Sequence, residues 1–150
     1  MPASDPLLEV QDLRVTLDSV SSAREAVRGV SFRIAAGEVL GIVGESGSGK
    51  TLTVSAILGL LPRGVRIGGG SVHFRGEDLR AASRHRLSEI RGREIAMVFQ
   101  DSLTSLNPVM RIGFQVQEPL LLHHMASSGA ARAAAEERLR SVGIPDPDRA

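Results

Sequence analysis

The chain has 150 residues, of which 42% are hydrophobic and 23% charged, and its formal net charge is +1 at pH 7. Such a balance excludes an acidic tail, a disordered polyelectrolyte and a general nucleic-acid-binding surface. Cysteine is absent, which excludes disulfides, thiolate metal sites and a cysteine nucleophile. The longest nearly apolar stretch, residues 54–61, is far shorter than the roughly 20 residues of a membrane-spanning helix. With no secretory signal at residues 1–6, we expect a soluble chain of cytoplasmic type.

The first part of the chain is expected to consist mainly of strands. Alternating apolar and polar residues predict strands over residues 8–17 and 30–34, with a Ser-rich loop over 18–25 between them. The apolar run Val39–Val43 predicts a strand that is covered on both faces. Glycine-rich sequence follows this run, and a helix is then expected over residues 50–61, ended by Pro62.

The remainder of the chain changes from strands to helices. Residues 64–70 are expected to form a flexible turn because they are rich in glycine. Further strands are expected over residues 71–75 and 94–99, and helices over residues 83–91, 112–122 and 129–142. Strand, loop and helix in this order indicate an α/β fold.

One segment carries a clear chemical signal, the pattern G-x-x-x-x-G-K-[ST] of a phosphate-binding loop. Its residues are Gly44, Glu45, Ser46, Gly47, Ser48, Gly49, Lys50 and Thr51. The glycines let successive backbone N–H groups turn toward one anion, and the following helix adds its positive N-terminal end. Lys50, the only lysine of the chain, supplies a compact ammonium for the β- and γ-phosphates, and the Thr51 hydroxyl suits Mg²⁺. We therefore expect binding of a nucleoside triphosphate.

A hydrolytic protein of this kind also needs an acidic ligand for Mg²⁺ and a group that orients water. The apolar run 95–99 is followed by Gln100 and Asp101. In one interpretation Asp101 is the metal ligand. In the other, Gln100 is offered to the γ-phosphate side and the metal-binding aspartate is not in this sequence.

Three stretches of the sequence resemble the ATP-binding subunits of ABC transporters, above all the oligopeptide, dipeptide and nickel importer branch. They are the loop 44–51, the segment Phe74–Leu79 (FRGEDL), and the segment Met97–Gly113, which is similar to the glutamine loop of that family. The resemblance covers about residues 8–143. It implies a P-loop NTPase fold with an N-terminal antiparallel β subdomain and phosphate-loop core (about 8–100) and the start of a helical subdomain (about 101–150), with an incomplete core sheet.

The resemblance also implies roles for particular residues. Residues 44–51 would bind the phosphates of ATP and, through Thr51, Mg²⁺. Gln100 would reach the Mg²⁺ and the catalytic water, so Lys50 and Gln100 are the expected catalytic residues. The family usually stacks adenine on an aromatic residue, whereas this chain has Leu17 at the matching place, so Leu17 and Val27 are expected to form an apolar wall for the base.

Partners follow from the same resemblance. Two ATP-binding subunits would hold ATP head to tail on the cytoplasmic face of the membrane, as peripheral proteins. The region after Gln100 would dock on the membrane permease, which a solute-binding protein supplies, and no nucleic acid is expected. The later family motifs, including the signature sequence, the acidic strand and the switch histidine, are not found, so we expect an N-terminal portion of a subunit that is inactive and aggregation-prone alone.

Two other functions stay open at this stage. A small phosphotransferase (kinase) would use Asp101 as its Mg²⁺ ligand, and a degenerate module would bind nucleotide only to dock a partner. The arginines between residues 80 and 93 are interleaved with acidic residues and predict a solvated, salt-bridged face. His123 and His124 are neighbours in sequence and are expected to be structural or solvated rather than metal ligands.

Overall fold

The computed structural model describes residues 5–18, 23–100 and 105–148. The chain divides into two compact units, Met1–Ser88 and Glu89–Ala150, and each is described by itself. The boundary that we expect near residue 100 between β subdomain and helical subdomain stays a prediction. In the described ranges no helix is long and apolar enough to cross a membrane.

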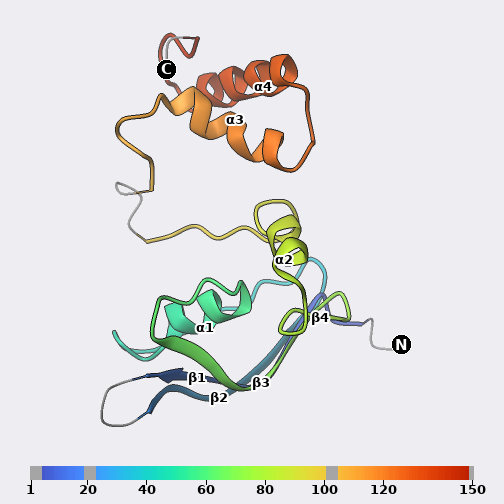
Figure 1. Ribbon diagram of the computed structural model, residues 1–150, viewed down its shortest axis with the longest axis vertical. Coiled ribbons are helices and arrows are strands. Elements are labelled where there is room, and N and C mark those ends of the chain that lie inside the picture. Colours follow the sequence, from blue (N-terminus) through green and yellow to red (C-terminus); the bar gives the residue numbers. More distant parts are fainter. Residues whose placement is uncertain (1–4, 19–22, 101–104, 149–150) are drawn as a thin grey trace. The chain divides into compact units, whose positions relative to one another are not determined.

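The first unit is built on an antiparallel sheet (Figure 1). Its strands are β1 (Leu8–Leu17), β2 (Arg24–Ile34), β3 (Val65–Phe74) and β4 (Glu77–Asp78), in the order β2-β1-β3-β4. The central strand β1 pairs with both long neighbours, so that Val10 lies opposite Phe32 on one side and Val72 on the other.

One face of this sheet carries the core of the unit. Buried apolar side chains come from β1, β2 and β3, and the helix α1 (Lys50–Ile57) contacts the same three strands. Among the described residues of this unit, the buried apolar ones are Val10, Leu13, Val15, Val27, Ala56, Ile57, Leu58, Val72, Phe74 and Leu79. This packing fixes the position of α1, and therefore of the loop that precedes it, relative to the sheet.

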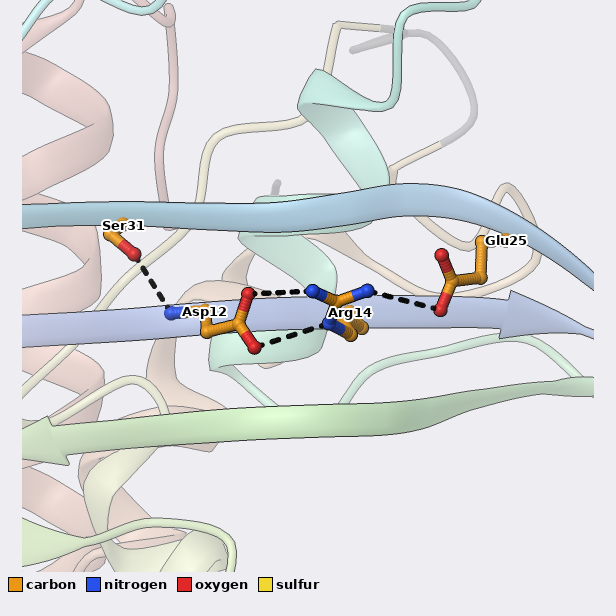
Figure 2. Close-up of polar contacts among 4 residues, drawn as sticks. All are labelled: Asp12, Arg14, Glu25 and Ser31. Carbon is orange, nitrogen blue, oxygen red and sulfur yellow. Dashed lines mark hydrogen bonds and ion pairs between the residues drawn. The ribbon is translucent and has the colours of Figure 1, made fainter.

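The residues between the buried positions of β1 are polar and form ion pairs along the strand (Figure 2). The carboxylate of Asp12 accepts two hydrogen bonds of 3.1 Å from Arg14, and Arg14 also lies 3.6 Å from Glu25. The Asp12 N–H donates a 2.8 Å hydrogen bond to the Ser31 hydroxyl instead of a ladder carbonyl. Asp12 has a φ of 45° where the register of β1 shifts against both neighbours, so it marks a β-bulge.

The structure corrects the expectation of a flexible turn over residues 64–70. The strand β3 begins at Val65 and runs through the glycines, because its backbone pairs with β1 and does not depend on side chains. At Gly70 a Cβ atom would come within 2.3 Å of the Asp12 carbonyl oxygen. The glycines therefore allow β3 to pass the bulge of β1 closely, and a glycine-rich run here belongs to a strand.

The expected strand over Val39–Val43 is also not formed. These residues have no ladder partner in the described part of the chain, and Val39 and Val43 are 95% and 96% exposed. Backbone that finds no neighbouring strand cannot form a sheet, whatever its apolar pattern. The helix after the loop is shorter than expected: α1 ends at Ile57 before Pro62 is reached, where Gly59 N–H donates to Ala56 O and Leu60 N–H to Ser55 O.

The second unit is helical. The helix α2 (Arg84–Ile90) leads into it, and α3 (Ile112–Leu122) and α4 (Ser128–Ser141) pack side by side (Figure 1). On α4 the buried residues are Ala131, Ala135 and Leu139, which recur every four positions and so form one face. Of the strand expected over residues 94–99, only an isolated bridge from Ile95 to Arg91 is present.

Candidate phosphate-binding site

The phosphate-binding pattern forms an exposed loop between residues 39–43 and α1. Residues 44–48 are exposed, and Lys50 is the first residue of α1. The Ser48 N–H donates a 3.2 Å hydrogen bond to the Glu45 carbonyl, which closes a turn. A Cβ atom at Gly44 would come within 2.7 Å of the Ser48 hydroxyl, so the loop turns back and residue 48 lies close to residue 44.

The side chain of Lys50 spans this curl. Its ammonium Nζ donates hydrogen bonds of 2.7 Å to the carbonyl oxygens of both Gly44 and Glu45, and lies 3.4 Å from the Ser48 hydroxyl. The only lysine of the chain is therefore held at the mouth of the loop, where an entering anion would meet it. An ammonium has three donors, and all three are directed to the loop here, so an anion would replace at least the longest of these bonds, the one to the Ser48 hydroxyl.

The last glycine of the loop is enclosed on two sides. Gly49 has a φ of +93° and is the N-cap of α1. Its carbonyl accepts two hydrogen bonds from Thr53, one of 2.8 Å from the backbone N–H and one of 2.9 Å from the hydroxyl. A Cβ at Gly49 would lie 3.0 Å from both the Ala26 carbonyl oxygen and Val27 Cγ2 of β2. Only glycine combines this φ with this close approach.

The N-terminus of α1 is well suited to an anion. Its first turn contains no acidic residue, and no side chain caps it. The first N–H groups of a helix have no acceptor within the helix, and the helix dipole places partial positive charge there. Together with the Lys50 ammonium they form an arrangement that would suit phosphate oxygens, and phosphate binding by residues 44–51 stays a prediction. Thr51 is exposed in the same turn, so its hydroxyl is accessible as a ligand for a phosphate-bound Mg²⁺.

The two residues predicted to line the adenine lie in different environments. Val27 is 3% exposed and packs beneath Gly49, whereas Leu17, at the end of β1, is partly exposed. Leu17 therefore offers more surface to a base than Val27 does. Both assignments stay predictions.

Gln100 lies in the second unit and is exposed, whereas Asp101 lies outside the described residues. The structure thus brings residues 44–51 together as one site, and the participation of Gln100 stays a prediction. Across the described ranges, His, Asp and Glu side chains form no group of three that could hold a metal ion.

Two polar residues were missed by the sequence reasoning. Thr53 is buried and bonds to the loop, and its only sequence signal is a hydroxyl four residues after the last loop glycine. Gln115 of α3 holds the segment 107–110, because its amide bonds to both the N–H and the carbonyl of Asn107, at 2.7 and 3.0 Å, and to the Met110 carbonyl. No local sequence pattern predicts the contact between Gln115 and residues 107–110.

Comparison with known proteins agrees with this geometry at the level of fold. The chain superimposes with a TM-score of 0.75 on the ATP-binding cassette MJ0796, solved as a dimer in a post-hydrolysis state bound to ADP and Pi. The two sequences are 22% identical, and the match covers 95% of this chain and 60% of the other. A second dimeric structure of the same cassette gives the same TM-score.

Curated relatives are more similar in sequence. The oligopeptide transport ATP-binding proteins OppD of Bacillus subtilis and of Escherichia coli are 44% and 45% identical to this chain over 95% of its length. The dipeptide transport ATP-binding protein DppD of Lactococcus lactis is 43% identical over 97% of the chain. The chain spans only 40–42% of the length of these relatives. Residues 27–150 match the family described as ABC transporter, and the chain therefore belongs to that family.

Proposed function

We propose that the chain is the nucleotide-binding part of an ATP-binding subunit that drives import of peptides or related small solutes. The observation that carries this proposal is the loop 44–51, with its curled backbone and the Lys50 ammonium at its mouth. Relatives 43–45% identical to the chain are peptide transport ATP-binding proteins, and they suggest the solute class.

Different residues of the loop bind different parts of the nucleotide. Backbone N–H groups of residues 44–51 and the N-terminus of α1 hold the phosphates, and Lys50 neutralises charge on the β- and γ-phosphates. The Thr51 hydroxyl binds the Mg²⁺ that accompanies ATP. Gln100, which is neutral and is both donor and acceptor, orients the attacking water and engages the Mg²⁺ side of the nucleotide.

Partners and location belong to the same proposal. A second ATP-binding subunit completes the nucleotide site head to tail, as the dimeric state of the structurally similar cassette suggests. The permease docks on the region after Gln100, and a solute-binding protein delivers the solute. The subunit works as a peripheral protein at the cytoplasmic face of the membrane.

Substitutions in the assembled transporter distinguish this function from a kinase, which none of the similar proteins named above supports. Gln100→Ala is expected to lower the steady-state rate of ATP hydrolysis by about 10²-fold, because it removes the group that orients water. Asp101→Asn is expected to leave that rate within about threefold, a change of less than 1 kcal/mol in the barrier. The measurement is phosphate release with saturating MgATP. The reverse order, with Asp101→Asn the more damaging, would contradict the transporter assignment and favour the kinase.

A further inference from the structure

The carbonyl of Gly49 determines where the next amide points. A trans peptide directs its C=O and its N–H to opposite sides, and no cis peptide is found among the described residues. The Gly49 carbonyl points into α1, where the backbone N–H and the hydroxyl of Thr53 both donate to it. The Lys50 N–H must then point out of the N-terminus of α1, toward the position of a bound phosphate.

Thr53 is built into the fold for this contact. Its side chain is buried, with 4% of the residue exposed, and its hydroxyl bonds to the Gly49 carbonyl at 2.9 Å. A threonine hydroxyl that bonds four residues back is common in helices, where it usually only satisfies the side chain. Here the carbonyl that it holds belongs to the loop, to a glycine at φ +93° whose backbone would otherwise be free to rotate.

The opposite side of Gly49 is held independently. Ala26 O and Val27 Cγ2 of β2 lie so close that a Cβ at Gly49 would come within 3.0 Å of each. The peptide between Gly49 and Lys50 is therefore confined between the strand β2 and the buried Thr53 hydroxyl. Both supports lie behind the loop and leave its anion-facing side exposed.

We propose that Thr53 is a positioning residue for phosphate binding, which acts through Gly49 to fix the orientation of the Lys50 amide. It does not touch the nucleotide. This inference rests on the proposed function, since the anion at the loop is taken to be the phosphate of a nucleotide.

The test compares Thr53→Val, Thr53→Ser and a matched control, using calorimetric titration of the complete protein with MgADP and thermal unfolding of the same samples. Valine keeps the shape of threonine without the hydroxyl, and the backbone bond from residue 53 remains. Thr53→Val is expected to weaken MgADP binding about fivefold, and Thr53→Ser to restore it to within about twofold. The control is Ser55→Ala, which removes another buried hydroxyl of α1 that does not bond to the loop, and it is expected to bind as the wild type does.

A purely structural role predicts a different result. Thr53→Val would then lower the unfolding temperature without changing the dissociation constant, or would weaken binding no more than Ser55→Ala does, and either outcome overturns the proposal. If the wild type binds MgADP but Thr53→Val binds equally well, only this inference fails. If the wild type does not bind MgADP, the proposed function fails and this inference with it.

Discussion

Gly70 and Gly76 have nearly the same backbone conformation, with φ of +83° and +81°, but very different surroundings. A Cβ at Gly70 would come within 2.3 Å of the Asp12 carbonyl oxygen and 2.5 Å of the Gln11 carbonyl oxygen. A Cβ at Gly76, in the turn between β3 and β4, would meet nothing within 4 Å. The pair separates the cost of a left-handed backbone from the cost of a steric clash.

Replacement of each glycine by alanine is expected to give unequal losses of stability. Gly76→Ala should lower the free energy of unfolding by about 1 kcal/mol, because only the backbone is strained. Gly70→Ala should lower it by roughly 3 kcal/mol or more, because β3 must also move away from the bulge of β1. Urea unfolding of both variants measures the difference. Equal losses would show that β3 does not pass the bulge as closely as described.

At the same scale, the position of the loop 44–51 before a helix could be predicted from the sequence, whereas the residues that support Gly49 could not. The loop depends on the types and spacing of eight adjacent residues, so the pattern of Gly44, Lys50 and Thr51 is sufficient to predict a tight loop followed by a helix. Thr53 and Val27 matter through their contacts with Gly49. The Val27 contact exists only after the strand β2 and the helix α1 have packed together. The Thr53 bond is local to α1, but the residue pattern of the loop ends at Thr51 and does not include it.

The C-terminal end of α3 shows how an element can end without glycine. His124 has a φ of +52°, its N–H donates to Leu121 O at 3.1 Å, and the N–H of Met125 donates to Leu120 O at 2.9 Å. This pair of bonds is the arrangement that usually has glycine in the left-handed position. His124 therefore takes a structural place in the turn, and it does so in a conformation unfavourable for a side chain.

His124→Gly is expected to stabilise the protein by about 1 kcal/mol, because glycine adopts the left-handed conformation without strain. His123→Gly is the matched control: its φ of −89° suits any residue, so glycine there should be neutral or destabilising through greater freedom of the unfolded chain. Chemical denaturation followed by circular dichroism compares the two. A loss of stability in both variants would refute this account of the helix end.

Elements differ in how far sequence determines them. The helices α3 and α4 lie close to the expected ranges because their hydrogen bonds are internal to each segment. The strands differ more from the ranges predicted from the sequence. The strand β3 includes glycines that suggest a turn, and residues 39–43 do not form the expected strand. A strand forms its hydrogen bonds with neighbouring strands, and the sequence of the segment itself does not show whether those neighbours are present.

In the whole molecule, two apolar segments, residues 39–43 and 95–99, contain valines that are exposed in the described structure. Val39 and Val43 precede the phosphate-binding loop and are more than nine-tenths exposed, and so is Val98 shortly before Gln100. Sequence correctly predicts the ABC transporter family, while the chain spans less than half of its curated relatives. Hydrolysis, the transported solute and the partners therefore stand as proposals, and nucleotide binding at residues 44–51 is the claim on which they all depend.

Calorimetric titration of the complete protein with MgATP tests nucleotide binding at residues 44–51 most directly. The variants are Lys50→Met, which removes the charge but keeps the length of the side chain, and Lys50→Arg, which keeps the charge. The account predicts that Lys50→Met weakens binding by about 10- to 100-fold, because a charge-assisted hydrogen bond to the phosphates is lost. Lys50→Arg is expected to have an intermediate affinity, because the planar guanidinium fits the tight loop less well than a compact ammonium does. Equal affinity of Lys50→Met and the wild type for MgATP would contradict it.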